Sequence, residues 1–593
     1  MSLNTTPTDE HVVPELQDDP PTAHDRTKRV AVRSWPRILI NTVLAIVVAY
    51  LVVVPLLILV YSSLKDSGSD LPFQVPGLSF ANYIAVFTTS TLFSVILNTL
   101  LYVVGTLIVS LILSLVTAYL FVRTDIPGRR ILESLTLAPM AIPVTVGAIA
   151  WALVANPVNG PLAIIIRQLF GLQIDVYTLP GMILVMGLFG VPTMYLMIAP
   201  ALASIGPEFE EAAATLGTPL WSRLRLIVLP LIRPALSSAS ILLIVVVLEG
   251  FAIPALLGLP KQIFVFSSLI QQYLQPPTGA ADYGKASTYG IIILAITLAL
   301  TLISNHGTRD ASRFKVVTGK GYKRARTPLG AWRIPIAAIV WFYMILSVLL
   351  PVLALVWTSL SPNNRPISLS GLSTLTLDNY VRFLTGDGMG QILWNTAQVV
   401  LVTATVTTAL ATWIALAASR NSFPGSRLLM ESTTLVLGIP SIVLGAGVLF
   451  LYLFLPVPLY GTVWIIVIAL VTRFLPRGAR LMQPAIMQID EGLTEAARVT
   501  GATPFTITRT IMLPLLRPAL LKTWLWVFAH ALGELPIALL LTSSYNKTLV
   551  VELWDSFTTS ANYPQACALA VVVLIISAGA TLVVNRIGTK GES

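Results

Sequence analysis

Long apolar stretches separated by short polar segments make up most of this chain. Each stretch is about 20 residues long, the length that crosses a bilayer as a helix. A helix satisfies its own backbone groups in lipid, so each stretch is predicted to be a membrane span. Six stretches fall in the first half, at 38–60, 93–121, 135–154, 179–202, 235–257 and 289–304, and six in the second, at 335–359, 392–417, 433–455, 461–482, 519–541 and 567–584. The pattern predicts an all-α polytopic membrane protein with about 12 transmembrane helices.

The composition of the chain is that of a membrane protein rather than a soluble domain. Of its 593 residues, 55% are hydrophobic and only 11% are charged, whereas soluble domains carry about 25% charged residues. The single cysteine, Cys567, lies in an apolar stretch. A disulfide framework and a cysteine-based zinc site are therefore excluded.

The sequence lacks the motifs of an enzyme or of an ATP-binding subunit. The phosphate-binding pattern G-x4-G-K-[ST] is absent, because Gly284-Lys285 and Gly319-Lys320 lack the required glycine and hydroxyl. There is no H-E-x-x-H zinc pair, and four histidines leave little room for histidine-based catalysis. We expect no catalytic residue, no established metal site and no cofactor, and any ATP that powers the protein must be bound by a separate subunit.

Basic residues fall mainly on one side of the predicted spans. If the N-terminus is inside, 27 of the 37 Lys and Arg residues lie on that side, 7 lie on the opposite side and 3 lie within the tenth span. By the positive-inside rule both termini are predicted to be cytoplasmic. The net charge of +10 is therefore a sign of topology, and nucleic-acid binding is disfavoured.

Five segments are predicted along the chain. Residues 1–37 are polar and form a disordered cytoplasmic tail, since the first span is too long for a signal peptide. Residues 38–305 form a first transmembrane unit and residues 334–586 a second. Residues 306–333 are a basic cytoplasmic linker between them, and residues 587–593 are a short cytoplasmic tail.

The two units are an internal repeat. Matching residues are 296 or 297 apart in the first part of each unit and 284 apart after a longer loop in the first unit. Because each unit has six spans, an even number, the repeat is parallel, with an axis along the membrane normal. The matches include Pro55 and Pro351, Asn82-Tyr83 and Asn379-Tyr380, Asn98-Thr99 and Asn395-Thr396, Pro127-Gly128 and Pro424-Gly425, Ile142-Pro143 and Ile439-Pro440, and Ile205 and Ile489.

The most informative match lies between the fourth and fifth spans of each unit. Glu211-Ala-Ala-Ala-Thr-Leu-Gly217 matches Glu495-Ala-Ala-Arg-Val-Thr-Gly501. Nine residues later each continues with the pattern I-x-L-P, ending at Pro230 and Pro514. Each copy predicts a short helix stopped by glycine and followed by a proline-punctuated return into the membrane. One copy would be an ordinary surface helix, but two copies at the same place favour a surface that docks another protein.

This pattern resembles the coupling loops, or EAA motifs, of the permease subunits of binding-protein-dependent ABC importers, and the resemblance covers nearly the whole chain. It implies a MetI-like permease fold in a bacterial plasma membrane, an ABC ATPase partner that is a homodimer, and an extracytoplasmic solute-binding protein. The residues that it implies for docking the ATPase are Glu211, Ala212, Ala213, Gly217, Glu495, Ala496, Ala497 and Gly501.

The fused two-unit arrangement is most similar to ferric-iron permeases, as is the stretch Gly533-Glu534-Leu535-Pro536. The chain departs from that subgroup after Leu541, where it has Thr-Ser-Ser-Tyr-Asn in place of an arginine-led loop. Ferric iron is the solute that the resemblance implies first, with polyamine, thiamine, phosphonate or sulfate as alternatives. A secondary transporter is a second class of function, although it leaves the paired loops unexplained.

Two acidic residues within predicted spans are candidates for the solute pathway. Charged residues in spans are costly and usually face a cavity or pathway. Glu249 and Glu534 lie in the fifth and eleventh spans, one residue from the repeat offset, and His530 lies one helical turn before Glu534. Two carboxylates and an imidazole suit a cation. The alternative is that neighbouring helices satisfy both carboxylates and the nearby prolines simply break the helices.

Three arginines in the tenth span form a rival signal. Arg473, Arg477 and Arg480 share one helical face, where the first unit has Phe189, Thr193 and Leu196. They could favour an anion in the pathway. We expect instead that they extend to the inner membrane surface or pair with the coupling region.

Overall fold

The computed structural model describes residues 35–589 except 69, 207, 311–326, 364–368, 421–425, 427–429, 432, 434 and 435. Most of the predicted N-terminal tail, most of the basic linker and the last four residues of the C-terminal tail lie outside the described residues, and the predicted segment boundaries stay predictions. The chain divides into Met1–Leu44 and Ala45–Ser593. The fold described below is that of the second part.

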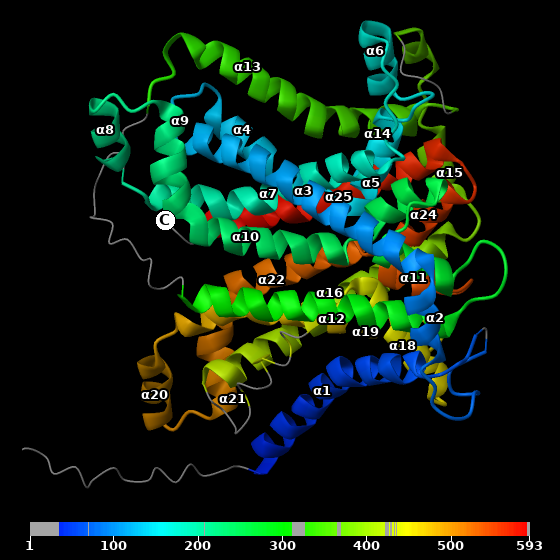
Figure 1. Ribbon diagram of the computed structural model, residues 1–593. Helices are drawn as coiled ribbons and strands as arrows, with labels where there is room; N and C mark the ends of the chain where they lie inside the picture. Colours follow the sequence, from blue (N-terminus) through cyan, green and yellow to red (C-terminus); the bar gives the residue numbers. More distant parts are fainter. Residues whose placement is uncertain are drawn as a thin grey trace, which may run out of the picture. The chain divides into compact units, whose positions relative to one another are not determined.

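The described residues form helices throughout (Figure 1). The first unit contains α1 (Trp35–Ser63), α2 (Ala81–Thr88), α3 (Ser90–Arg123), α4 (Arg129–Leu137), α5 (Val144–Val154), α6 (Pro161–Phe170), α7 (Leu179–Ser204), α8 (Glu208–Thr215), α9 (Leu220–Arg223), α10 (Leu229–Glu249), α11 (Phe266–Leu274) and α12 (Tyr283–Asp310). The second contains α13 (Arg333–Met344), α14 (Leu350–Leu360), α15 (Asp378–Thr385), α16 (Met389–Ser419), α18 (Ser441–Phe454), α19 (Val463–Met487), α20 (Glu491–Val499), α21 (Pro504–Ile507), α22 (Leu513–Gly533), α23 (Leu535–Leu541), α24 (Leu549–Thr558) and α25 (Tyr563–Thr589).

The described helices include nine regular candidate spans and three less regular ones, which together match the predicted number of about twelve. Nine helices in the described part of the chain are long and apolar enough to cross a membrane. The remaining three are α18, which has 14 residues, α19, which carries three arginines, and a pair of helices bent by 106°. That pair replaces the straight third span predicted at 135–154. The bend falls at Ile142 and Pro143, because proline biases the residue before it toward extended backbone.

The predicted fifth and eleventh spans are also interrupted. The helix α10 ends at Glu249, and residues 254–258 form a separate π-helical turn. In the second unit α22 ends at Gly533, and Glu534 has extended backbone before α23 begins. Pro254 and Pro536 follow these breaks. The helices are therefore discontinuous at the two acidic residues.

The repeated Asn-Tyr pairs perform the same structural task in both units. The Asn82 side chain donates to the carbonyl oxygens of Ser63 and Lys65, at 3.2 and 2.6 Å. The Asn379 side chain donates to those of Ser359 and Ser361, both at 2.9 Å. Each asparagine thus satisfies two carbonyls at the end of the first span of its unit, where no intrahelical donor remains.

A second repeated pair holds the loop before α11 or α24. The Asn98 side chain donates to Phe264 O at 3.2 Å, and the Asn395 side chain donates to Tyr545 O at 3.0 Å. The hydroxyl of Thr396 accepts from the backbone N–H of Leu549 at 2.8 Å, which orders the start of α24. These repeated residues therefore reflect shared loop anchoring.

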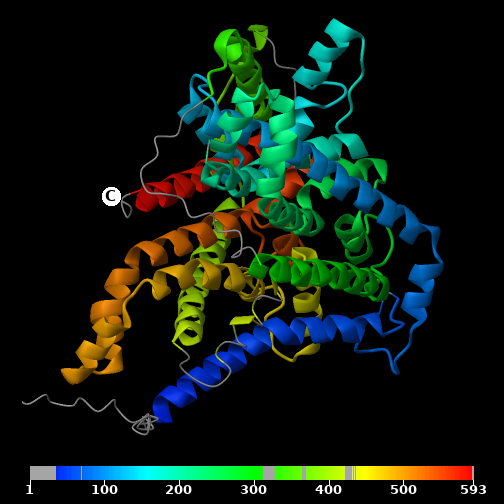
Figure 2. The ribbon, with the colours of Figure 1, turned by 60° about the vertical axis from the view of Figure 1, so that its left-hand side comes forward.

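The first span of each unit packs against the other unit. On one side Tyr50 of α1 donates to the Tyr452 hydroxyl of α18 at 3.4 Å, and a Cβ on Gly447 would lie 2.6 Å from Pro55 O. On the other side α13 and α14 pack against α4 and α5. In Figure 2 the blue helix α1 runs beside the yellow segments of the second unit. This reciprocal exchange ties the units together.

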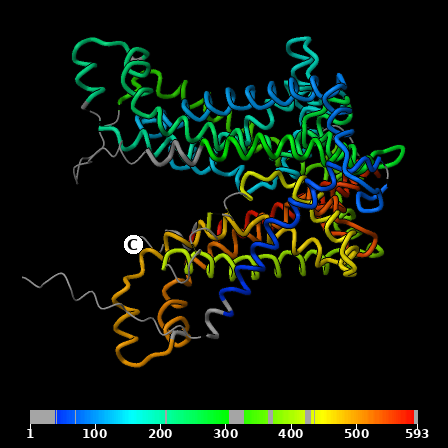
Figure 3. The backbone as a smooth tube through the Cα atoms, turned by 60° about the horizontal axis from the view of Figure 1, so that its bottom comes forward, coloured from blue at the N-terminus to red at the C-terminus, as the bar shows by residue number. Residues whose placement is uncertain are grey.

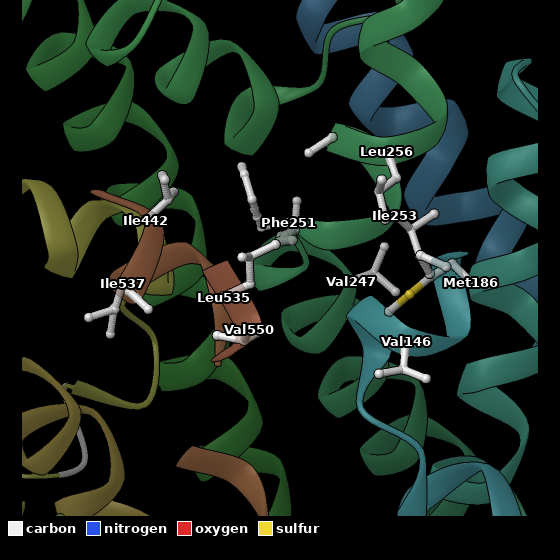
Figure 4. Close-up of a cluster of buried hydrophobic side chains, with 14 of the residues drawn as sticks. Val146, Met186, Val247, Phe251, Ile253, Leu256, Ile442, Leu535, Ile537 and Val550 are labelled. Atoms are coloured by element: carbon white, nitrogen blue, oxygen red, sulfur yellow. The ribbon is translucent and has the colours of Figure 1, made fainter. Parts of the chain in front are cut away.

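The packing between the units is apolar. One continuous cluster of buried side chains includes Val247 and Phe251 of the first unit and Leu535 and Val550 of the second. Figure 4 shows these side chains pointing into a shared interior from helices of both units. Apolar side chains of both units therefore pack together beside the two helix breaks.

Candidate functional site

The helices α8 and α20 carry the matched loop motifs, and Figures 1 and 3 show both at the same end of the helical bundle. Both end at a glycine in the left-handed region, with φ of 75° at Gly217 and 81° at Gly501. The N–H of Thr218 bonds to Ala213 O and the N–H of Ala502 bonds to Ala497 O, both at 3.0 Å. Both helices are thus closed by the same Schellman-type turn.

The predicted docking residues lie at the surface of these helices. The side chains of Glu211, Ala212, Glu495 and Ala496 are exposed, whereas Ala213 and Ala497 are half-buried. Beside them, large apolar side chains also face outward. Leu216 is 86% exposed and Val499 is 88% exposed, and Trp221 and Phe505 exceed 70%. A mixed surface with protruding apolar groups is typical of a protein interface.

The return into the bundle is also the same in both units. Residues Leu224–Val228 and Thr508–Met512 are π-helical turns at matching positions. Each precedes a proline, Pro230 or Pro514, which lacks the N–H that an α-helix would use. The backbone widens by one residue at these points, so the predicted proline-punctuated return is a matched π-turn.

Two arginines that the sequence analysis did not single out fasten these helices. Arg123 ends α3, is buried, and contacts Ile205 O and the Glu210 carboxylate. Arg420 follows α16 and contacts Ile489 O and Thr494. The two arginines are 297 residues apart, which is a repeat offset. This spacing was visible in the sequence and could have identified the two arginines as a repeated pair.

The carboxylate of Glu249 forms a buried ion pair between the two units. Its Oε2 lies 2.6 Å from Arg473 Nη2 and 3.4 Å from Arg477 Nη2. The side chains of Glu249 and Arg473 are both 6% exposed. Arg473 also donates from Nη1 to Ile439 O at 2.9 Å. The sequence analysis left open that a neighbouring helix satisfies the intramembrane carboxylates. For Glu249 this alternative is the one observed, because α19 supplies the arginines.

The expectation for the arginine face is wrong at two of its three positions. Arg473 and Arg477 contact Glu249 of α10 instead, which provides a buried anion beside them. Arg480 is exposed, as expected for an arginine near the end of a span.

The other two pathway candidates lie near this pair. Glu534 interacts electrostatically with both Arg473 and Arg477. The His530 ring lies with Nδ1 2.8 Å from Trp526 O and stacks on the Trp526 ring at 3.9 Å. The structure thus gathers two carboxylates and two guanidiniums, with the imidazole to one side.

Both glutamates have a buried carboxylate oxygen without a hydrogen-bond donor. Within the described part of the chain, Oε1 of Glu249 and Oε1 of Glu534 are buried and accept no hydrogen bond. The described part of the chain contains no group of three His, Cys, Asp or Glu side chains that could hold a metal ion. The cluster brings together opposed charges from both units.

Comparison with known proteins identifies relatives over most of the chain. It is 26% identical over 527 residues to the "Putative ferric transport system permease protein FbpB 1" of Haemophilus influenzae, covering 87% of this chain and 80% of that protein. It is 25% identical over 551 residues to the ferric transport system permease protein FbpB of Actinobacillus pleuropneumoniae, covering 91% and 77%. The sulfate transport system permease protein CysT of Escherichia coli is 31% identical over 248 residues, which cover 41% of this chain and 87% of CysT.

A protein family matches the chain twice. The family described as binding-protein-dependent transport system inner membrane component matches residues 110–309 and again residues 407–589. These ranges contain α8 and α20 with their π-turns, and they include both helix breaks. Members of this family are permeases, and they work with a separate ATPase and a substrate-binding protein. The chain therefore belongs to the binding-protein-dependent ABC transporter permeases, as a bacterial multi-pass membrane protein with two permease units in one polypeptide.

Proposed function

We propose that this permease imports ferric iron delivered by an extracytoplasmic binding protein. The observation that carries the importer mechanism is the matched pair α8 and α20, closed by the same glycine turn and returned by the same π-turn. The assignment of iron is supported by the two ferric transport permeases that match about nine-tenths of the chain.

The matched helices dock the ATPase on the cytoplasmic side. This side is chosen from the distribution of basic residues, which predicts that both termini are cytoplasmic. Since Gly217 and Gly501 have nearly the same φ, the two helices suit two copies of one partner. An ATPase homodimer therefore fits them, and its closure would move α8 and α20 together.

The solute passes near the helix breaks at Glu249 and Glu534. Discontinuous helices near the membrane centre are a common setting for transport sites. In this conformation Arg473 and Arg477 neutralise Glu249, so a cation would require rearrangement of this cluster. Replacing both Glu249 and Glu534 by Ala tests the path, and unchanged iron uptake in that variant would refute it.

The docking role is tested by replacing Gly217 and Gly501 with Val. Both glycines have positive φ and open space around the missing Cβ, so the substitution strains the backbone without a steric clash in the bundle. We expect the variants to insert normally and to lose iron uptake. Gly390→Val serves as control, because Gly390 also has open space but no positive φ. Undiminished uptake in the Gly217 and Gly501 variants would exclude the coupling role.

Sulfate is the second candidate solute. The CysT relative favours it, as do the buried Arg473 and the half-buried Arg477, since guanidinium groups bind oxyanions well. The deciding measurement is ATP hydrolysis by the reconstituted complex, with the binding protein loaded with ferric iron or with sulfate. Stimulation by sulfate alone would replace iron in the proposal.

A further inference from the structure

The two arginines that fasten the coupling helices make one contact in common. Nη2 of Arg123 donates to Ile205 O at 3.0 Å, and Nη2 of Arg420 donates to Ile489 O at 3.4 Å. The arginines are 297 residues apart and the isoleucines 284 apart, which are the two repeat offsets. The same arginine-to-carbonyl contact thus occurs in both units, just before the coupling helix begins.

Each arginine also contacts a side chain of the coupling helix, and here the units differ. Nε of Arg123 lies 3.2 Å from Oε1 of Glu210, with both side chains 9% exposed. Nη1 of Arg420 donates to Oγ1 of Thr494 at 3.3 Å and lies 3.6 Å from Oε1 of Glu491. Thr494 occupies the position of Glu210, 284 residues on. A buried ion pair in the first unit corresponds to a hydroxyl contact in the second.

We propose that Arg123 and Arg420 are positioning residues that join each coupling helix to α3 or α16, so that a displacement of α8 or α20 moves that long helix with it. The proposal rests on the proposed docking of the ATPase to α8 and α20. Arginine suits this task because its planar guanidinium can hold a carbonyl and a side-chain oxygen at once, which the single ammonium of lysine does less rigidly.

The joined helices lead to the buried charges. The helix α3 packs along α7, and α16 packs along α19. The helix α19 carries Arg473, which pairs with Glu249 across the two units. A displacement that starts at α20 therefore has a continuous packed route through Arg420 and α16 to the cluster at the helix breaks.

A purely structural role must be separated from transmission. Arg123→Met leaves the Glu210 carboxylate buried without its cation, which can destabilise the chain. The double variant Arg123→Met with Glu210→Leu removes both charges, and such paired replacements often preserve stability. Arg130→Met is the matched control, since Arg130 is an exposed arginine near the same end of α3.

The first experiment measures ferric iron imported per ATP hydrolysed in proteoliposomes holding the permease, its ATPase and its binding protein. We expect the double variant to retain ATP hydrolysis while iron per ATP falls about tenfold. Arg420→Met should lower the ratio about twofold, because its contacts are more exposed. The Arg130 control should match the wild type. An unchanged ratio in the double variant overturns the proposal, even if both rates decline together.

The second experiment is independent of the solute. Spin labels at Ala214→Cys in α8 and Val116→Cys in α3, both exposed positions, report the distance between these helices in nanodiscs, with Cys567 replaced by Ser. We expect a narrow distance distribution that broadens in the double variant and not with Arg130→Met. If the distance distribution stays narrow in the double variant, Arg123 does not hold α8 to α3 and the proposal is overturned. If wild-type proteoliposomes import no iron but the distance distribution broadens in the double variant as expected, the solute assignment fails and the positioning role stands.

Discussion

The two units share a backbone plan but distribute charge differently. In both, an asparagine caps the first span, a glycine closes the loop helix, and a π-turn returns the chain to the bundle. Among the described residues, the loop helix of the first unit is held by a buried ion pair between Arg123 and Glu210, whereas Arg420 of the second unit contacts a hydroxyl and an exposed carboxylate. Duplicated backbone contacts have thus stayed matched, whereas side-chain charges differ between the units.

The cluster of charged residues near the helix breaks is also divided between the two units. Glu249 comes from the first unit, and Arg473 and Arg477 come from the second. The first unit has Phe189 and Thr193 where the second has these arginines. Because a buried charge must be paired, the charge of one unit requires its partner from the other. The units are therefore complementary rather than interchangeable at their interface.

The largest expected effect comes from breaking that complementarity. Glu249→Ala leaves the Arg473 guanidinium buried without its anion, which should lower the free energy of unfolding by about 3–5 kcal/mol. The measurement is denaturant unfolding of the purified chain in detergent.

A paired variant controls for the loss of packing at this site. Glu249→Leu combined with Arg473→Met removes both charges and should recover most of the lost stability. If Glu249→Ala alone unfolds like the wild type, the ion pair does not join the units.

A smaller effect is expected from the asparagine contacts that the two units share. Asn82→Ala and Asn379→Ala each leave two carbonyls without a donor, and each should cost about 1–3 kcal/mol. We expect nearly equal losses, measured in the same unfolding assay. Thr88→Ala and Thr385→Ala are matched controls, because these exposed hydroxyls bond only within their own helices. Unequal losses for the two asparagines would contradict the shared role.

The smallest of these effects concerns the exchanged first spans. Gly447 contacts Pro55 so closely that a Cβ would lie 2.6 Å from the proline carbonyl oxygen. Its repeat counterpart is Ala150, which lines a cavity together with Pro351. Gly447→Ala should therefore destabilise the chain by about 1–2 kcal/mol, measured as a lower midpoint of thermal unfolding. Ala150→Gly is the reciprocal variant. If it destabilises the chain more than Gly447→Ala does, the close contact at Gly447 is not the tighter of the two.

The sequence predicted most of the helices because spanning a membrane imposes a length and a hydrophobicity that can be counted. The predicted fourth span, 179–202, corresponds to α7 (Leu179–Ser204), and the eighth, 392–417, lies within α16 (Met389–Ser419). The sequence did not predict the 106° bend at Ile142 and Pro143. A proline marks where a bend can occur, but the angle depends on the helices packed around it.

Part of the candidate site could be predicted from the sequence, and part of it could not. The loop helices α8 and α20 could be found from sequence, since their glycine and proline positions are local signals that occur twice. The pairing of Glu249 with Arg473 could not, because the two residues are 224 positions apart. Sequence alone therefore determined the membrane class, the repeat and the positions of the matched loop motifs. Only the tertiary structure decided which buried charges meet, since a charge in an apolar interior is stable only beside the partner that the fold brings to it.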